Sequence, residues 1–316
     1  MKSMTLTEPF AYGFRKTGQK SETILIPRDC LEPDNFLQFM GYTLLKEQYV
    51  ALEEFCSQYN MTPEEMFSEP DSLEVENGLV TIINSAGKNI CNSDKKLFVP
   101  KQLEYLQELN CSNGGLIEII GLPARLQEFS CGKNLLGGLP ELPQQLLELY
   151  CYDNPLGKLP ELPSQLQILK CSKNQLAFLP ILPLQLSELS CWNNQLTVLP
   201  ELPQYLQILD CSGNQLTSFP ELPQRLQKLC CWENKLCVLP ELPQYLQKLF
   251  CGDNLLTVLP KLPQQLQLLY CDNNPFLVLV APKEVSSLRQ VHCQNTKISQ
   301  KTIKQLQKQG VEVIYS

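Results

Sequence analysis

A cysteine recurs at one constant interval through most of this chain, and this regular spacing constrains the fold more than any other feature. The column comprises Cys111, Cys131, Cys151, Cys171, Cys191, Cys211, Cys231, Cys251, Cys271 and Cys293, and only its last step is slightly longer than the others. Self-similarity at a short fixed period is typical of a solenoid, in which each repeat is one structural unit stacked on the next.

One repeat, residues 206–225, reads LQILDCSGNQLTSFPELPQR. Leu209 and Cys211 alternate with Asp210, which predicts a short strand that turns leucine and cysteine inward. In most repeats a Leu-Pro-x-Leu-Pro tract follows, and its prolines exclude helix and favour extended geometry before them. We therefore predict a leucine-rich repeat solenoid of α/β class with a parallel β-sheet on its concave side and extended chain on its convex side.

An asparagine column follows the cysteine column, three residues further along each repeat. Its members are Asn134, Asn154, Asn174, Asn194, Asn214, Asn234, Asn254 and Asn274. The column falls where each strand must turn, and an amide side chain can pair with buried backbone groups that have no other partner. We interpret it as a structural ladder.

The 15 cysteines could indicate a disulfide scaffold, but a repeat register does not indicate cross-links. Parallel side chains on adjacent strands lack the angled geometry that a disulfide requires. We predict that the column is buried and reduced and that its thiols serve as small core groups.

Both ends of such a stack need caps. At the C-terminal end, Ser299–Gln309 reads as a short helix with Ser299 as N-cap and Gly310 as its stop, followed by a strand over Val311–Tyr315. The expected C-terminal cap therefore covers residues 299–316, after repeats over residues 101–298.

The N-terminal residues 1–100 are expected to form a mainly helical cap region. Residues 34–59 have apolar positions at alternating spacings of three and four, which predicts an amphipathic helix. Thr62-Pro63-Glu64-Glu65 reads as a capping box that starts a second helix. Residues 76–79 resemble a tight hairpin turn between Leu73 and Ile82, and we place the boundary to the repeats near Pro100.

Composition restricts the partners. The 26 basic and 33 acidic residues give a net charge of −7, which opposes binding to nucleic acid through phosphate contacts. No apolar stretch follows Lys2, so we expect neither a Sec signal peptide nor a membrane span. Export, if it occurs, would use another route.

The unit L-x-x-L-x-C-x-x-N-x-L-x-x-L-P-x-L-P-x-x resembles the repeats of bacterial effector proteins of the YopM and IpaH/SspH group, over about two thirds of the chain. The duplicated Leu-Pro carries the resemblance. It implies a secreted effector that acts on a host protein, delivered by a specialised secretion system into the host cytosol. Ile314 is also compatible with the export tails of Legionella-like effectors, although a hydrophobic residue there is common.

Two departures from that group matter. Cysteine stands where its repeats usually have an aliphatic strand residue. The sequence ends at Ser316, shortly after its last repeat, so we expect no C-terminal ubiquitin-ligase domain of the IpaH kind.

Few residues offer catalytic chemistry. His292, the sole histidine, directly precedes Cys293, and adjacent side chains of a strand point to opposite faces, so we expect an exposed histidine beside a core cysteine and no dyad. A row of cysteines inside apolar layers does not converge as tetrahedral zinc binding requires. Cys230 occupies an outward position near Lys228 and Lys248, whose ammonium groups could make it the most reactive thiol. We expect no catalytic residue, metal or cofactor.

The outward strand positions form three columns on the concave face, where solenoids usually bind partners. The first column runs Glu108, Glu128, Glu148, Ile168, Glu188, Ile208, Lys228, Lys248, Leu268, and the second runs Asn110, Ser130, Tyr150, Lys170, Ser190, Asp210, Cys230, Phe250, Tyr270. The third column holds Tyr152, Trp192 and Trp232. Exposed aromatic and cationic side chains dominate the energetics of protein interfaces, although the tryptophans could instead only shield the sheet.

We therefore expect a non-enzymatic scaffold that binds a eukaryotic host protein. The candidate contact residues are Tyr150, Tyr152, Lys170, Trp192, Asp210, Lys228, Cys230, Trp232, Lys248, Phe250 and Tyr270. One alternative is a substrate adaptor of a host ubiquitin ligase, because residues 24–52 faintly resemble an F-box. Another is an enzyme in the N-terminal region, which contains no histidine and no recognisable nucleophile motif.

Overall fold

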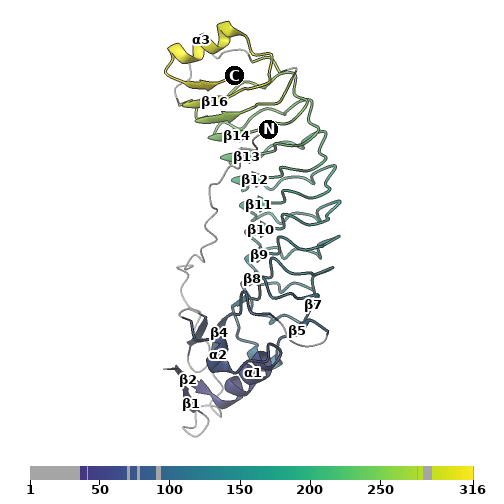
Figure 1. Ribbon diagram of the computed structural model, residues 1–316, viewed down its shortest axis with the longest axis vertical. Coiled ribbons are helices and arrows are strands. Elements are labelled where there is room, and N and C mark those ends of the chain that lie inside the picture. The colour runs from purple at the N-terminus through teal and green to yellow at the C-terminus, as the bar shows by residue number, and fades with distance from the viewer. Residues whose placement is uncertain are drawn as a thin grey trace.

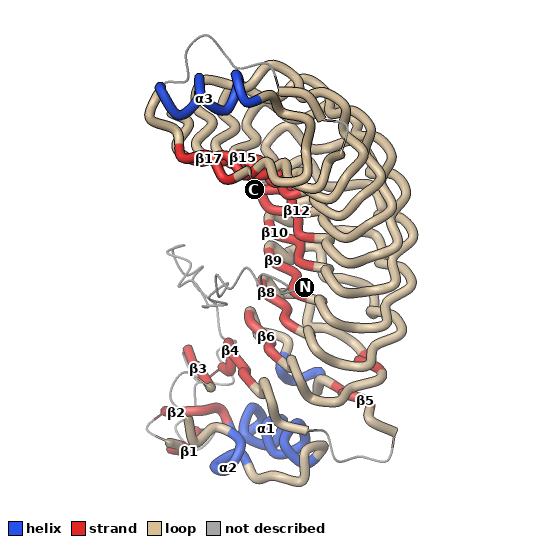
Figure 2. Tube along the Cα trace, turned by 45° about the horizontal axis from the view of Figure 1, so that its top comes forward, coloured by secondary structure: helices blue, strands red, loops and turns tan. Residues whose placement is uncertain are grey.

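The computed structural model describes residues 36–40, 42–69, 72–76, 79–89, 94–275, 277–279 and 287–315. Over these residues the chain forms a curved solenoid, with strands along its concave side and irregular extended chain along its convex side (Figure 1, Figure 2). A 13-stranded sheet runs through the molecule. The predicted leucine-rich repeat solenoid is confirmed.

The repeat strands are short and pair in parallel in a constant register, which matches Glu188 with Ile208 and, at the last pair of repeats, Leu268 with Gln290. They are β6 (Glu108–Asn110), β8 (Glu128–Ser130), β9 (Glu148–Tyr150), β10 (Ile168–Lys170), β11 (Glu188–Ser190), β12 (Ile208–Asp210), β13 (Lys228–Cys230), β14 (Lys248–Phe250), β15 (Leu268–Tyr270) and β16 (Gln290–His292). This register stacks equivalent residues of successive repeats directly on one another.

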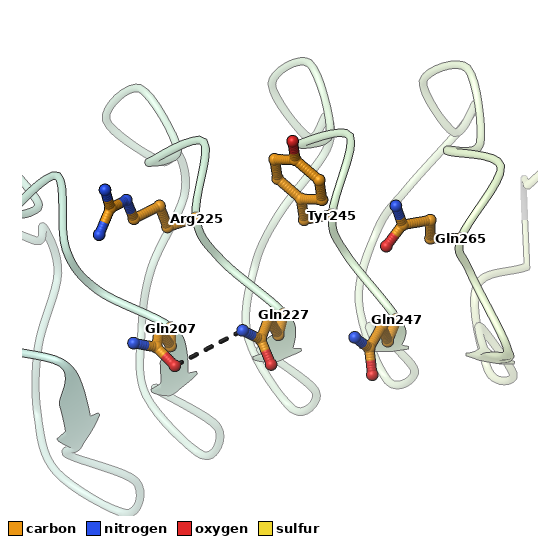
Figure 3. A pocket seen from close by; sticks show the side chains of 6 residues that line it. All are labelled: Gln207, Arg225, Gln227, Tyr245, Gln247 and Gln265. Atoms are coloured by element: carbon orange, nitrogen blue, oxygen red, sulfur yellow. Dashed lines mark hydrogen bonds between the residues drawn. The ribbon is translucent and has the colours of Figure 1, made fainter.

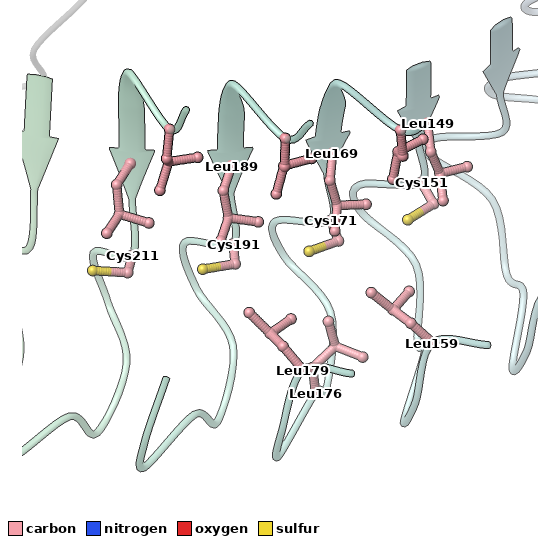
Figure 4. Packing of buried hydrophobic residues seen from close by; sticks show 14 of the residues in the cluster. Leu149, Cys151, Leu159, Leu169, Cys171, Leu176, Leu179, Leu189, Cys191 and Cys211 are labelled. Carbon is pink, nitrogen blue, oxygen red and sulfur yellow. The ribbon is translucent and has the colours of Figure 1, made fainter. Parts of the chain in front are cut away.

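The core contains leucine and cysteine from every repeat. Leu189 and Cys191 are fully buried, and Figure 4 shows the thiols of successive repeats in one row beneath the strands. The ten cysteines of the column are buried and free, as predicted. Burial raises the pKa of the Cys171 thiol to about 12, so the thiols stay protonated and behave as apolar core groups.

The asparagine column is the predicted ladder. Asn174 donates from its amide nitrogen to the carbonyls of Cys151 and Cys171, at 3.1 and 2.9 Å, and accepts from the Leu156 amide at 3.1 Å. Each asparagine therefore satisfies backbone groups of its own repeat and of the preceding one. In the C-terminal repeat Thr296 takes this place and donates to the Cys293 carbonyl at 2.6 Å.

The residue before each ladder asparagine adopts a left-handed conformation that sequence patterns did not predict. Lys173 has φ +52°, Asn193 +51° and Gly213 +61°. This conformation disfavours residues with a Cβ atom. It points the amide hydrogen toward the next repeat, as in the 2.8 Å bond from the Lys173 amide to the Trp192 carbonyl.

The prediction of a helix over residues 34–59 is wrong for the first half of that range. Residues 36–39 and 42–45 pair as two antiparallel strands, and the helix occupies only the part that follows. The elements are β1 (Phe36–Phe39), β2 (Tyr42–Leu45) and α1 (Lys46–Ser57). Aromatic residues in this stretch favour strand pairing, and Leu44 is fully buried from β2.

The rest of the N-terminal region also contains both helix and strand, so its described residues are not mainly helical. Helix α2 (Pro63–Met66) begins with the predicted capping box of Thr62 and Glu65 but makes only one turn. The predicted hairpin is formed by β3 (Leu73–Glu76) and β4 (Leu79–Asn84), although residues 77 and 78 of its turn lie outside the described residues.

Strand β4 pairs in parallel with β6, so the sheet of the repeats continues into the N-terminal region. A separate parallel pair lies on the convex side, formed by β5 (Lys96–Phe98) and β7 (Glu118–Ile120), and a 3-10 helix η3 (Lys101–Leu103) connects β5 to the first repeat.

The C-terminal cap matches its prediction. Helix α3 (Gln300–Lys308) is capped by the Ser299 hydroxyl, which accepts from the Thr302 amide at 3.1 Å. Gly310 has φ +84°, and β17 (Glu312–Ile314) closes the sheet against β16.

Candidate protein-binding face

The concave face is built from the first and last residue of each repeat strand. In β12, Leu209 is fully buried, whereas Ile208 and Asp210 are half-buried on the opposite face. Register pairing then aligns the first and second columns as the sequence predicts. The face is rigid because each strand is held by hydrogen bonds to both neighbouring repeats.

Large and small residues alternate along the third column. In chain order the positions hold Gly132, Tyr152, Ser172, Trp192, Ser212, Trp232 and Gly252. A Cβ atom added at Gly132 would lie 2.8 Å from the Tyr152 ring, so this ring lies over the preceding repeat. The alternation, visible in the sequence but not used for the prediction, leaves room for each aromatic side chain.

The two tryptophans differ in exposure. Trp232 is 43% exposed, whereas Trp192 is half-buried with the Lys173 ammonium 5.0 Å from its ring centroid. Ser212 lies between them in the column and is only 2% exposed. Both tryptophans are thus on the face, and Trp232 offers the larger accessible surface.

Aromatic rings continue along the second column toward the C-terminal end. Phe250 and Tyr270 pack edge to face with centroids 4.9 Å apart, and the Tyr270 ring stacks on His292 at 3.9 Å. The Lys228 ammonium lies 5.9 Å from the Phe250 ring centroid. This part of the face combines ring surface with positive charge.

His292 is not the exposed histidine that we expected. It is half-buried, and its Nε2 is buried without a hydrogen-bond partner among the described residues. Burial lowers the pKa of the imidazole, while Asp272 and Glu312 act in the opposite direction. Cys293 is turned into the core at 2% exposure, so the two side chains form no dyad.

Cys230 is not activated by the lysines beside it, and its burial also limits the role of exposed contact residue that we expected for it. Its side chain is only 6% exposed, and burial and the nearby Asp210 carboxylate raise its pKa to about 12, although Lys228 and Lys248 act to lower it. The burial penalty outweighs both ammonium groups. Burial likewise raises the pKa of the Asp210 carboxyl group.

The N-terminal half of the face is acidic. Glu108, Glu128 and Glu148 lie side by side in register on three adjacent strands. Glu128 is 8% exposed, and burial, with the charges of Glu148 and Glu108, raises its pKa to about 8. A signal for this cluster was present in the sequence, because glutamates at equivalent positions of successive repeats must lie beside one another on parallel strands.

Two side-chain contacts lie beside this acidic cluster, and only the second is an ion pair. The Tyr150 hydroxyl donates to the Glu148 carboxylate, and the Lys170 ammonium pairs with Glu188 at 3.0 Å. Lys170 also lies 5.7 Å from the Tyr150 ring centroid. The candidate contact residues of the second column are therefore held in place by one another.

A shallow hollow of about 290 Å³ lies on the flank of the solenoid, beside the starts of the strands (Figure 3). It is lined by Gln207, Arg225, Gln227, Tyr245, Gln247 and Gln265. Gln227 donates to Gln207 at 3.5 Å, and Arg225 stacks on Tyr205 at 4.7 Å. The hollow contains no nucleophile or carboxylate among these lining residues.

The described ranges contain no group of three or more histidine, cysteine, aspartate or glutamate side chains placed to hold a metal ion. None of the helices in these ranges has the length and apolar character needed to span a bilayer. Of the F-box-like segment, residues 24–35 and 41 lie outside the described residues. Residues 36–39 and 42–45 are strands instead of the amphipathic segments that the resemblance requires.

Comparison with known proteins supports the repeat class directly. A family model described as leucine-rich repeats (2 copies) matches residues 184–224. With the parallel sheet and its constant register, this match defines a leucine-rich repeat protein. No match is found among curated protein sequences.

Two Yersinia structures are similar to this chain. YopM from Yersinia enterocolitica WA-314 is 31% identical with a TM-score of 0.61, over 69% of this chain and 51% of that chain. YopM from Yersinia pestis, described as a leucine-rich effector protein, is 28% identical with a TM-score of 0.62, over 80% of this chain and 72% of that chain. The repeats of this chain are therefore similar to those of leucine-rich repeat proteins of the bacterial effector type, and the chain spans about half the length of the first of these structures.

The functional domain of InlJ from Listeria monocytogenes shares the fold, with a TM-score of 0.60 and 23% identity over 85% of this chain and 59% of that chain. That domain is described as including a cysteine ladder. A column of stacked cysteines therefore occurs in another solenoid of this kind.

Proposed function

We propose that this protein binds a protein of a eukaryotic host through its concave face and acts as a scaffold or sequestering effector without catalysis of its own. Export by a specialised bacterial secretion system into the host cytosol is part of the proposal. Its support is the likeness to YopM structures, one of which is described as an effector.

The observation that carries the proposal is the exposed surface of Trp232 beside the ring cluster of Phe250 and Tyr270. Tryptophan and tyrosine are the residues that most often dominate binding energy at interfaces. A rigid sheet presents them without the cost of ordering a loop. The candidate contact Lys248 lies next to this centre on the same strand as Phe250, and Trp192 lies two repeats from Trp232 in the third column.

The acidic cluster of Glu108, Glu128 and Glu148 adds a charge pattern to the same face. A partner that crosses the whole face would meet a cluster of carboxyl groups around β8 and positive charge near β13 and β14. Such patterns orient a partner and raise the association rate more than they raise affinity.

The test begins with affinity purification of the intact chain from a eukaryotic lysate, followed by calorimetry with the protein recovered. Trp232→Ala should weaken binding by about 2 kcal/mol or more and leave the melting temperature nearly unchanged. Lys228→Glu should mainly slow association. Wild-type affinity in a Trp192→Ala, Trp232→Ala double variant would contradict the concave assignment.

A further inference from the structure

The repeat over residues 171–190 differs from its neighbours on the convex side. It carries Ile181, which is 90% exposed, and Leu184, which is 73% exposed. The residues equivalent to Ile181 in the other Leu-Pro repeats are Glu141, Glu161, Glu201, Glu221, Glu241 and Lys261, and those equivalent to Leu184 include Gln144, Gln204, Gln224 and Gln244. Polar residues therefore suit the fold at these positions, and packing does not require the apolar ones.

Phe178, 58% exposed, extends the same surface. Buried leucines recur every three residues along this segment, at Leu176, Leu179 and Leu182, and the last two are only 7% and 6% exposed. A period of three is typical of polyproline II geometry, which places residues three apart on one face about 9 Å from each other. Phe178, Ile181 and Leu184 thus form one exposed row, which we call the convex apolar row.

Exposed apolar surface continues from the row into the following repeat. Val198, 59% exposed, is the equivalent of Phe178 in the next repeat. Contiguous exposed apolar surface of this kind marks interaction sites in soluble proteins.

Negative charge flanks Ile181 on both sides, while the preceding repeat places the exposed Lys158 beside Phe178 at one end of the row. Glu161 and Glu201 are the equivalents of Ile181 one repeat before and one repeat after, and both are exposed. In the described part of the chain neither carboxylate has an ion pair or a side-chain hydrogen bond. The surface therefore suits an occupant that is apolar in the middle and cationic at both ends.

This charge pattern argues against two of the possible binding partners, a second copy of the chain and a membrane. Two copies of the chain related by a twofold axis at Ile181 would place Glu161 of each copy against Glu201 of the other. Like charges in that position oppose self-association. An anionic membrane surface would be repelled by the same carboxylates.

We propose that the convex apolar row binds an amphipathic helix of a partner protein, with apolar side chains over Ile181 and Leu184 and a lysine or arginine at each of Glu161 and Glu201. Equivalent residues two repeats apart are at least about 10 Å apart, from the strand spacing of about 4.8 Å. Residues seven apart on a helix lie on one face about 10.5 Å from each other. The site lies on the side of the solenoid opposite the concave face, so it does not depend on the concave assignment.

The experiment compares the wild-type chain with an Ile181→Glu, Leu184→Gln variant, which restores the residues of the neighbouring repeats. The probe is a fluorescent synthetic peptide of about five helical turns, with a leucine face and lysines seven residues apart. The matched control peptide has glutamate in place of each lysine. Fluorescence anisotropy should show that the lysine peptide binds the wild-type chain at least about tenfold more tightly than it binds the variant, and about tenfold more tightly than the control peptide binds.

A second variant transplants the row. Ser218→Phe, Glu221→Ile and Gln224→Leu, added to the first variant, would rebuild it two repeats further on, between Glu201 and Glu241, and should restore binding of the lysine peptide. Unchanged melting temperatures would show that all variants are folded. The proposal is overturned if wild type does not bind the lysine peptide, if the first variant binds it equally, if the two peptides bind equally, or if sedimentation shows a wild-type dimer that the first variant abolishes.

Discussion

The Tyr270 ring stacks on the His292 imidazole, with ring centroids 3.9 Å apart and 23° between the ring planes. The Tyr270 hydroxyl donates to Gln290 at 3.0 Å, so the ring is held between two groups of strand β16. The stack covers the end of the aromatic surface and shields the imidazole from solvent. Burial therefore lowers the pKa of His292.

His292 is the only histidine of the chain, so its titration by NMR gives an unambiguous signal. We expect a midpoint below the ordinary pKa value of 6.5. Since the folded state prefers the neutral ring, stability should fall as the pH drops below 6.5. Tyr270→Ala should move the midpoint back toward 6.5, and a wild-type midpoint at or above 6.5 would show that the ring is not shielded.

Glu128 should make the folded protein less stable at alkaline pH. Its pKa in the folded state is about 8, above the ordinary value of 4.5, so the free energy of unfolding should decrease as the pH rises from about 4.5 to about 8. Glu128→Gln keeps the neutral shape and should raise that free energy at pH 9 by about 1 kcal/mol or more. Urea unfolding at pH 5 and pH 9 measures the effect, and an equal change at both pH values would contradict it.

Gly213 occupies a left-handed position, and a Cβ atom there would collide with the Asn193 side chain. We expect Gly213→Ala to lower the free energy of unfolding by at least about 1 to 2 kcal/mol. Gly157→Ala is the matched control, because Gly157 has open space around it and no left-handed conformation. In thermal unfolding the Gly157→Ala control should have a higher melting temperature than the Gly213→Ala variant. The reverse order would count against the left-handed turn at Gly213.

Thiol labelling separates core from surface cysteines. Cys237 is exposed, whereas Cys230 and the cysteine column are buried. Among the described cysteines only Cys237 should react rapidly in the native protein, and the others should react after denaturant is added. Mass spectrometry of labelled peptides assigns the sites, with Cys237→Ser as control. Rapid labelling of Cys230 would contradict its burial.

Sequence periodicity was sufficient to predict the repeats. A constant repeat length determines which residues lie side by side, so the inward leucine and cysteine and the asparagine ladder follow from the spacing within a single repeat. The C-terminal cap was also predictable, because Ser299 and Gly310 are local signals of where a helix begins and ends.

The N-terminal hairpin was mispredicted because the apolar spacing typical of a helix begins only at Leu45, and the predicted helix was extended back from there to residue 34. Pairing across β1 and β2, which buries Leu44, excludes a helix in that extension, and that contact is not visible in a single segment. The exposure of Cys230 and His292 was misjudged for a related reason. Both residues are outward by register, yet neighbouring repeats cover them.

The most direct test of the concave assignment is site-specific photo-crosslinking in a eukaryotic lysate, with a photoreactive amino acid placed at position 232. Position 241 is the convex control, since Glu241 is exposed and lies three repeats from Ile181. We predict that the probe at Trp232 crosslinks to one discrete host protein and that the probe at Glu241 does not. Crosslinking of that protein from position 241 alone would place the binding surface elsewhere and contradict the proposed function.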